Sequence, residues 1–376
     1  MVITKRISLL REARLGEHRV LLVPNHIQQF LREGFEVFVE RNAGAGIGYS
    51  DNDYRAVGAK IVDTEEAWHI SPFAVKYKAP IPEEAKFLHK ELHLGAIYHA
   101  EGDRSLVQIL CQSGVTAYSY EFFQTPEGIF PLSVPGSEIA GKLAVLYGAY
   151  YLQSHTGGAG ILLPYVVGVQ PPKVVIIGYG NAGGAAARLS IAMGADVVVL
   201  GTHPERLRRF QSTVPSSVKC YLTSLEVLER ELPDADLVIG AILISTYDTP
   251  SLIGEDLVRQ MKKGSVIIDI TCGYGSGYLP TFPHFTTFEN PMIDRFGVLH
   301  CKIDILPSAV PKTASQAISH IIVPYLIALG NSIFNPSVTD PISAAGKIIE
   351  DGRIIHPEVQ RHMDILSRME GSERDK

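Results

Sequence analysis

Residues 174–183 read Val-Val-Ile-Ile-Gly-Tyr-Gly-Asn-Ala-Gly, four apolar residues followed by a glycine-rich turn. The glycines at positions 178, 180 and 183 have the GxGxxG spacing, and an alanine-rich helical stretch (184–193) follows them. A second apolar run, residues 197–200, comes at the distance expected for the next strand of a βαβ unit. The spacing alone is a weak signal, but this strand–turn–helix context predicts a dinucleotide-binding turn.

Each position of this turn has a physical role in holding a pyrophosphate. Gly178 permits the tight turn, Gly180 lets the backbone approach the phosphates, and Gly183 lets the helix pack closely on the strand. The free N–H groups and the positive dipole at the helix N-terminus then face the ligand. The predicted contacts with the dinucleotide are therefore Gly178, Gly180, Asn181, Ala182 and Gly183.

The end of the second strand bears on the choice between NAD and NADP. Enzymes that use NAD usually carry an Asp or Glu there for the ribose hydroxyls, whereas this chain has Gly201, followed by Thr202. The missing carboxylate removes repulsion against a 2′-phosphate, and Arg206 could pair with one. Arg206 could equally be a solvated helix residue. The pattern predicts NAD or NADP, with NADP favoured.

Composition excludes several other classes of protein. The net charge of -6 argues against a nucleic-acid partner. No apolar run reaches the roughly 18 residues of a membrane span, and Lys5 and Arg6 interrupt any signal core. The four cysteines are widely spaced without a CxxC, so neither a disulfide framework nor a zinc site is expected. We therefore predict a cytoplasmic protein with no membrane association and no metal.

Short apolar runs alternate with helical segments along the whole chain. At 376 residues the chain is long enough for two domains. This alternation predicts α/β domains with mostly parallel sheets. The pattern of apolar runs and helical segments changes near residues 131–135. Strands are expected at 7–10, 35–39, 61–62, 74–76, 94–98, 174–177, 197–200, 237–239 and 266–270, and helices at 24–33, 138–153, 184–193 and 314–329.

Several segments together resemble the alanine dehydrogenase family, which includes the NAD-binding part of proton-pumping transhydrogenase. The resemblance implies two Rossmann-like, doubly wound domains in an α/β fold, and a homo-oligomer. It implies a substrate domain built from residues 1–134 and 306–376, with a dinucleotide-binding domain, residues 135–305, inserted between them. The segments that carry it are residues 17–20, 43–46, 48–53, 75–78, 137–141, 178–183, 235–241, 261–266 and 310–313.

The resemblance also implies a catalytic site. Arg19 and Lys78 match the residues that hold the substrate carboxylate, and His99 matches the histidine that moves the proton. A guanidinium with an ammonium suits a 2-amino or 2-oxo acid, a histidine titrates near neutrality, and the nicotinamide supplies the hydride. Taken singly, Arg19 beside Glu17 could be a surface ion pair, and His99 a loop residue. Further implied cofactor contacts are Ser137, Gly240, Ile242, Leu243 and Asp269.

Four positions depart from the family pattern. Gly273 aligns with an aspartate of the catalytic site, Gly136 with a methionine that narrows the alanine pocket, Ile97 with an aromatic residue, and Ile305 with an asparagine near the cofactor, for which Asp304 could be a shifted substitute. The changes at Gly136 and Ile97 would enlarge the substrate pocket. We therefore predict an NAD(P)-dependent oxidoreductase that acts on the C–N bond of an L-amino acid larger than alanine, by oxidative deamination or reductive amination.

Two alternatives stay open. One is an opine-type reductive condensation of an amino acid with a 2-oxo acid, as in carboxyethylornithine synthase or saccharopine dehydrogenases. The other is a catalytically silent dinucleotide-binding protein, which the glycine at position 273 would explain. His89 and His93 are four residues apart and could bind a metal on a helix, but no third ligand follows at a recognisable spacing.

Overall fold

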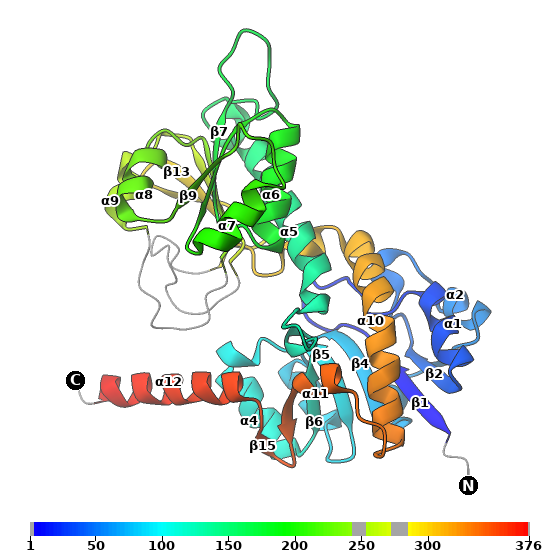
Figure 1. Ribbon diagram of the computed structural model, residues 1–376. Helices are drawn as coiled ribbons and strands as arrows, with labels where there is room; N and C mark the ends of the chain where they lie inside the picture. Colours follow the sequence, from blue (N-terminus) through cyan, green and yellow to red (C-terminus); the bar gives the residue numbers. More distant parts are fainter. Residues whose placement is uncertain (1–3, 243–252, 272–284, 375–376) are drawn as a thin grey trace. The chain divides into compact units, whose positions relative to one another are not determined.

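The computed structural model describes residues 4–242, 253–271 and 285–374, and it divides the chain into two compact units (Figure 1). The terminal unit consists of residues 1–136 and 308–376, and the central unit of residues 137–307. The boundary at residue 136 falls within the first turn of helix α5 (Val134–Tyr151). Both units are α/β, and each is built around its own sheet.

The terminal unit contains an eight-stranded sheet. Its six N-terminal strands are parallel and have the order β3-β2-β1-β4-β5-β6, the doubly wound order of a Rossmann fold. Two antiparallel strands from the C-terminal segment, β14 and β15, extend the edge at β6. The strands are β1 (Lys5–Leu9), β2 (Phe35–Glu40), β3 (Lys60–Val62), β4 (Phe73–Lys78), β5 (His93–Ile97), β6 (Thr116–Ser119), β14 (Lys347–Glu350) and β15 (Arg353–Ile354).

Helices cover both faces of this sheet because successive side chains of a strand point to opposite sides. On β4, Phe73 and Val75 join the cluster that includes α1 and α10, whereas Ala74 joins the cluster with α3, α4 and α12. Continuous apolar strands are therefore expected here. The helices are α1 (Pro24–Arg32), α2 (Asp51–Ala56), α3 (Thr64–His69), α4 (Arg104–Ser113), α10 (Pro311–Phe334), α11 (Pro341–Ala345) and α12 (Pro357–Arg374), with 3-10 turns η1 (Ala45–Ile47), η2 (Pro82–Phe87), η3 (Ala100–Gly102), η4 (Tyr120–Phe122), η5 (Pro131–Ser133) and η7 (Leu306–Ala309).

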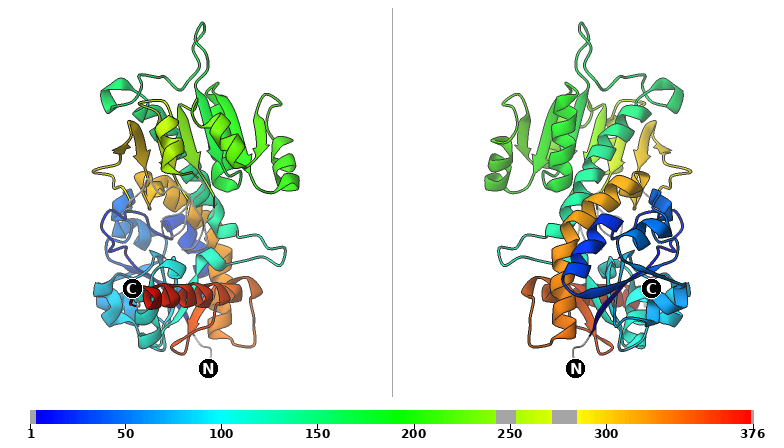
Figure 2. Two further views of the ribbon diagram at one scale, coloured as in Figure 1. Left: turned by 90° about the vertical axis from the view of Figure 1, so that its left-hand side faces the viewer. Right: turned by 90° about the vertical axis from the view of Figure 1, so that its right-hand side faces the viewer.

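The central unit contains a seven-stranded sheet with the same order, β9-β8-β7-β10-β11-β13, and an antiparallel edge strand β12 (Figure 2). The strands are β7 (Lys173–Ile177), β8 (Asp196–Gly201), β9 (Lys219–Leu222), β10 (Leu237–Gly240), β11 (Val266–Asp269), β12 (Ile293–Arg295) and β13 (Val298–Cys301). The other helices are α6 (Asn181–Ala192), α7 (Pro204–Gln211), α8 (Leu225–Glu231) and α9 (Glu255–Gln260), with η6 (Ser154–Thr156) after α5.

Helix α10 is long and apolar enough to cross a membrane by length and composition. Its residues Ile318 and Ile322 lie in the core of the terminal unit, against the α1 side of the sheet. The hydroxyls of Ser315 and Ser319 accept hydrogen bonds of 2.9 and 3.0 Å from backbone N–H groups of the loop before α1. Its polar groups thus have partners inside the protein, and α10 is a core helix of this unit.

Three predicted helices differ from the structure at their ends. The helix expected at residues 184–193 begins at Asn181, directly after the extended backbone of Gly180, so the last part of the glycine motif forms its first turn. The helix expected at 138–153 begins earlier, at Val134, and that at 314–329 runs from Pro311 to Phe334. A proline near the start of each of these two helices suits a first turn, where its missing N–H is not needed.

Candidate functional site

Four neighbouring strands of the terminal unit end at one edge of the sheet, in the order β6-β5-β4-β1. Ligands of doubly wound sheets bind beyond these carboxyl ends, where the strand order reverses, here between β1 and β4. A titratable side chain stands at each strand end: Glu12 follows β1, Lys78 ends β4, His99 follows β5 and Glu121 follows β6. The fold therefore gathers these four chain segments at one place.

His99 has a left-handed backbone, with φ of 46°, which is uncommon for a residue with a side chain. The carboxylate of Glu121 holds this conformation. Its Oε2 accepts hydrogen bonds from the backbone N–H groups of Tyr98 at 3.0 Å and His99 at 2.9 Å, and from the hydroxyl of Ser119 at 2.7 Å. Backbone strain of this kind is a feature of functional sites.

The imidazole of His99 lies between a carboxylate and an ammonium group. Its Nδ1 is 2.5 Å from Oε1 of Glu121, and its Nε2 is 2.9 Å from Nζ of Lys78. An ionised carboxylate only accepts hydrogen bonds, so Glu121 places the imidazole proton on Nδ1. Nε2 then carries a lone pair and accepts from Lys78. The arrangement leaves the lone pair of Nε2 facing the Lys78 ammonium, where Nε2 can take part in proton transfer.

A second carboxylate, Glu101 on η3, lies beside this pair. One ligand atom from each of His99, Glu101 and Glu121 lies within 4.8 Å of the others, and Oε2 of Glu101 is buried without a hydrogen-bond partner among the described residues. Because the Lys78 ammonium already lies on Nε2 and Glu121 occupies Nδ1, we interpret this cluster as holding a proton. The expected absence of a metal stays a prediction.

The pKa values of the two carboxylates are shifted in opposite directions. Burial, and then repulsion from Glu121, raise the pKa of Glu101 to about 7. Burial would also raise the pKa of Glu121, but the charge and hydrogen bonds of His99 hold it well below its usual range. Two close carboxylates rarely ionise together, so one proton stays in the cluster near neutral pH.

This difference predicts a pH-dependent effect of Glu101→Gln on stability. Because folded Glu101 keeps its proton up to about pH 7 while the unfolded carboxyl loses it near pH 4.5, its contribution to stability is lost as the pH rises through this window. Relative to wild type, Glu101→Gln should gain roughly 1–3 kcal/mol in free energy of unfolding between about pH 5 and pH 8. Denaturant unfolding at the two pH values measures this.

The exposed neighbour Asp103, which caps α4 by accepting a hydrogen bond from the Leu106 N–H, offers a control. Asp103→Asn removes a carboxylate two residues from Glu101 and should cost the same at both pH values. Equal effects of Glu101→Gln at the two pH values would contradict the assigned titration.

Arg19 is buried, so its pair with Glu17 is not a surface ion pair. The side chains are 4% and 0% exposed, and Glu17 binds the guanidinium through both oxygens, with Nε to Oε1 at 2.7 Å. The ring of Tyr77 packs on the guanidinium, 4.1 Å from ring centre to Cζ. Burial would raise the pKa of Glu17, but its bonds with Arg19 lower it overall. Glu17 therefore orients Arg19 before any ligand arrives.

Glu12 is hydrogen-bonded to the strand that bears Lys78. Its two carboxylate oxygens accept hydrogen bonds from the backbone N–H groups of Tyr77 at 2.6 Å and Lys78 at 3.2 Å. Burial raises the pKa of Glu12 to about 7, against the opposing charge of Lys76. Glu12 and Arg19 also line a hollow of about 200 Å³. Lys78 and His99 are not among the residues that line this hollow.

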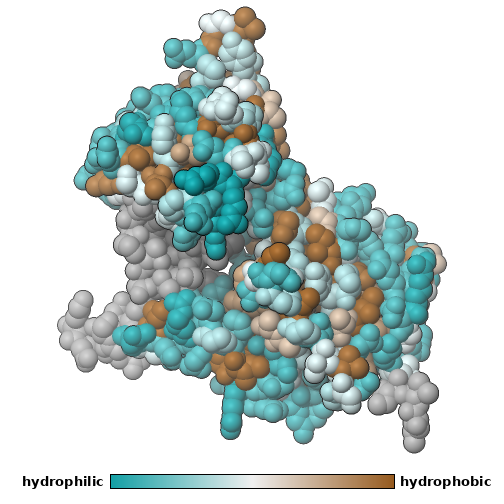
Figure 3. Space-filling view, in the orientation of Figure 1, coloured by the Kyte–Doolittle hydropathy of each residue, from teal (hydrophilic) through white to brown (hydrophobic). Residues whose placement is uncertain are grey.

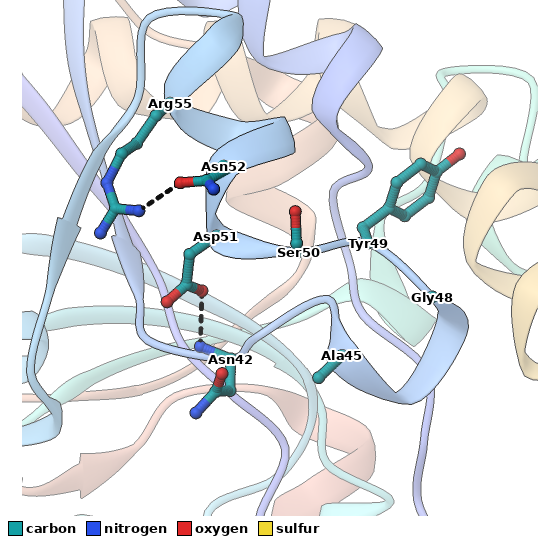
Figure 4. Close-up of a pocket in the computed structure, with 8 residues that line it drawn as sticks. All are labelled: Asn42, Ala45, Gly48, Tyr49, Ser50, Asp51, Asn52 and Arg55. Atoms are coloured by element: carbon teal, nitrogen blue, oxygen red, sulfur yellow. Dashed lines mark hydrogen bonds between the residues drawn. The ribbon is translucent and has the colours of Figure 1, made fainter.

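A shallower hollow of about 460 Å³ lies next to it, between η1 and α2 (Figure 4). Polar groups of its lining are hydrogen-bonded to one another. The N–H of Asn42 donates to Asp51 at 2.8 Å, and Arg55 donates to Asn52 at 2.7 Å. It contains none of the predicted site residues. We assign it no role.

The glycine turn of the central unit has the shape that a dinucleotide requires. Gly178 has a φ of 107°, and a Cβ there or at Gly183 would overlap the backbone of the turn itself or of β10's end. A Cβ at Gly180 would meet no atom of the described residues within 4 Å, and Gly180 and Asn181 are exposed. The turn is thus tightly packed on one side and open at the start of α6, which suits a bound pyrophosphate.

The remaining predicted cofactor contacts have different settings. Gly240 ends β10, and Ile242 packs 3.1 Å from the Cβ position of Gly178. Asp269, at the end of β11, is 2% exposed and pairs with Lys302 at 2.9 Å. The other predicted contacts lie in the central unit. Ser137 is on α5, Ala182 is on α6 and Arg206 is on α7, whereas Gly201 ends β8 and Thr202 follows it. Leu243 lies outside the described residues.

Of the predicted specificity positions, Ile97 lies next to the titratable cluster, because it pairs with Lys78 across β5 and β4. Ile97 ends β5 and is partly buried against the core. Among the described residues, no atom lies within 4 Å of a Cβ built on Gly136. Gly273 lies outside the described residues. His89 and His93 do not lie on a helix: His89 follows η2 and His93 begins β5, so they do not form the helical metal pair considered above.

Sequence patterns alone did not assign roles to Glu12, Glu101 or Glu121. Glu121 had a signal, because it follows the apolar stretch at residues 115–118 as His99 follows its strand. Glu12 likewise follows the first strand. A search for acids just after each expected parallel strand would have found Glu12 but not Glu121, because no strand was expected before Glu121.

Comparisons with known proteins agree with this arrangement. Residues 8–140 match the family "Alanine dehydrogenase/PNT, N-terminal domain", and residues 144–357 match "Alanine dehydrogenase/PNT, C-terminal domain". The chain belongs to the alanine dehydrogenase/PNT family. The family prediction, the α/β class with two doubly wound domains and the predicted class of amino-acid dehydrogenase are confirmed.

Individual members of the alanine dehydrogenase/PNT family are similar over most of their length. The chain is 37% identical to an alanine dehydrogenase of Staphylococcus epidermidis over 341 residues, 90% of this chain and 91% of that one. It is 35% identical to the alanine dehydrogenase of Bacillus subtilis, over 95% and 94% of the chains. A solved L-alanine dehydrogenase structure has a TM-score of 0.89 at 36% identity, covering 96% of this chain and 99% of that one. A transhydrogenase of Sinorhizobium meliloti, at 20% identity with a TM-score of 0.78 and coverage of 93% and 100%, shares the fold.

Proposed function

We propose that this protein is an NAD(P)-dependent oxidoreductase that acts on the C–N bond of an L-amino acid, by oxidative deamination or the reverse reductive amination. The observation that carries the proposal is the Lys78–His99–Glu121 chain at the carboxyl end of the terminal sheet. We assign substrate binding to the terminal unit and dinucleotide binding to the glycine turn of the central unit. When bound, the nicotinamide supplies the hydride chemistry.

Each charged residue has a task in this proposal. Arg19, held by Glu17, and Lys78 bind the substrate carboxylate through charge-assisted hydrogen bonds. Nε2 of His99 takes the proton that leaves the amino group as the C–N bond is oxidised, and returns it in the reverse direction. Glu121 keeps the proton on Nδ1 and so keeps Nε2 available.

The proposed substrate is larger than alanine. This part rests on Gly136, whose Cβ position is open, and on Ile97 at the end of β5. The relatives compared above are named for alanine, so the size of the side chain is the point at which this chain is proposed to differ.

Gly136→Met tests the size of the pocket. The longer side chain should fit without displacing any described atom and should occupy the space for the substrate side chain. We expect kcat/KM for the preferred larger amino acid to fall by roughly 10–200-fold, while kcat/KM for alanine is unchanged or rises. Leu146→Met, on an exposed part of the same helix, is the control and should change neither value. Equal losses for both substrates would contradict the assignment.

The function itself is tested by following reduced nicotinamide across a panel of L-amino acids with NAD and with NADP, and by the reductive assay with each 2-oxo acid and ammonia. Turnover with a single amino acid supports the proposal. Turnover that requires both an amine donor and a 2-oxo acid would instead make the protein an opine-type enzyme. Dinucleotide binding without any turnover would make it a silent binding protein.

We also propose a cytoplasmic homo-oligomer. Hydrophobic side chains are exposed along residues 162–169, a loop of the central unit whose tip carries brown surface in Figure 3. Val167 is 88% exposed and Val169 63%. A monomer seldom leaves such a stretch in water, and the segment from residue 156 to 172 carries no charge that would oppose burial against another copy. Sedimentation equilibrium measures the state of assembly.

A further inference from the structure

The aromatic ring of Tyr179 covers Gly201 at the end of β8. Tyr179 is the variable residue between the first two glycines of the turn, and a Cβ built on Gly201 would overlap Cε1 and Cδ1 of its ring. The ring is held on its other sides: its hydroxyl donates to the carbonyl of His203 at 3.3 Å, and the Phe210 ring lies 6.0 Å away. Any side chain at position 201 would have to displace this ring.

Position 201 matters because of its place in the sheet. β8 lies next to β7, the strand that leads into the glycine turn, and in a doubly wound dinucleotide domain the end of this neighbouring strand faces the adenosine ribose. A carboxylate there would bind the 2′- and 3′-hydroxyls and repel a 2′-phosphate. With Tyr179 in place the chain cannot carry one at this position.

The residues that follow Gly201 have basic character. Thr202, His203 and Arg206 are exposed at the start of α7, with one acid, Glu205, among them. Two further arginines, at positions 208 and 209, give the segment 201–211 three guanidinium groups against one carboxylate. A hydroxyl, an imidazole and a guanidinium group are suitable donors to a phosphate.

We propose that Tyr179 and Gly201 form a matched pair that excludes a ribose-binding carboxylate and so selects a dinucleotide with a phosphate on the adenosine ribose, NADP, over NAD. The inference rests on the proposed function, because it assumes that the glycine turn binds a dinucleotide. Tyr179 acts by filling space over Gly201, and the hydroxyl of Thr202 and the guanidinium of Arg206 donate to the phosphate.

The test measures dissociation constants of NADP⁺ and NAD⁺ by titration calorimetry, which needs no turnover. Wild type should bind NADP⁺ at least about tenfold more tightly than NAD⁺. Gly201→Asp alone places the carboxylate against the ring of Tyr179 and should weaken the binding of both NADP⁺ and NAD⁺. Tyr179→Ala/Gly201→Asp removes the obstruction and should reverse the preference, with NAD⁺ at least about tenfold tighter. Circular dichroism establishes that each variant is folded.

Two arginines of α7 provide a matched comparison. Arg206→Ala should weaken the binding of NADP⁺ by about tenfold and leave the binding of NAD⁺ unchanged. Arg209→Ala, near the other end of the same helix, should alter the binding of neither dinucleotide. Tighter or equal binding of NAD⁺ by wild type, or a double variant that still prefers NADP⁺, would overturn the inference and leave the proposed function standing. Failure of both dinucleotides to bind would overturn the proposed function itself.

Discussion

Replacing Glu121 with glutamine should lower kcat for amino-acid oxidation by about 10²–10⁴-fold, close to the loss that His99→Ala should cause by abolishing proton transfer. Glu121 uses both carboxylate oxygens as acceptors, Oε1 for Nδ1 of His99 and Oε2 for two backbone N–H groups and a hydroxyl. Glutamine has one acceptor oxygen and one NH₂ group, so it can serve only one of these sets.

Either orientation of the glutamine amide should lower kcat. If the NH₂ group faces Nδ1, the imidazole proton moves to Nε2, where it meets the ammonium of Lys78. If the NH₂ group faces the backbone, the left-handed conformation of His99 loses its acceptor. Initial rates across pH, with dinucleotide binding measured alongside, separate a lost base from a lost fold.

The matched control is Glu91→Gln. Glu91 also contacts a histidine, His89, at 3.3 Å, but its side chain is 64% exposed. This variant should keep wild-type kcat. If Glu121→Gln kept the rate and pH profile of wild type, the carboxylate would not set the tautomer of His99 and the proposed use of Nε2 as base would be wrong.

Removing Glu17 should have the largest effect on stability. Glu17→Ala leaves the Arg19 guanidinium buried without the carboxylate that binds it through two oxygens. The loss of one partner of a buried ion pair costs about 3–5 kcal/mol of free energy of unfolding, because the remaining charge stays desolvated. Denaturant unfolding gives the value directly.

Two further variants define this effect. Asp63→Ala removes one of the two carboxylates that pair with Arg41, but this pair is mostly exposed and its loss should barely move the unfolding midpoint. Glu17→Leu/Arg19→Met replaces both charges by apolar groups and should recover most of the stability, since no charge remains buried. A loss for Glu17→Ala no larger than for Asp63→Ala would mean that water reaches Arg19 in solution.

Local patterns predicted the glycine turn and nine strands, and they missed β6, β9, β12, β13, β14 and β15. The runs at residues 174–177 and 197–200 are continuous and apolar because both faces of the sheet are covered, and β7 and β8 lie there. The role of Gly178 could be predicted because its turn requires a positive φ. Helix ends were less readable: α6 begins at Asn181, three residues before the predicted start.

The candidate site divides in the same way. His99, Lys78 and Arg19 were predicted through a family resemblance, and the structure brings His99 and Lys78 into contact. The roles of Glu121 and Glu101 were not predicted, because no strand was expected before Glu121 and Glu101 lies in a short 3-10 turn. Each acquires its role from what lies beside it after folding, a histidine with a left-handed backbone for Glu121 and a second buried carboxylate for Glu101.

The sequence by itself determined the α/β class, the dinucleotide turn and the family, since these follow from apolar runs, glycine spacing and matched segments. Only the tertiary structure decided which groups surround His99 and that Tyr179 covers Gly201. The physical reason is distance along the chain. Lys78 and Glu121 are 21 and 22 residues from His99, and hydrogen bonds join them because parallel strands place their carboxyl ends side by side.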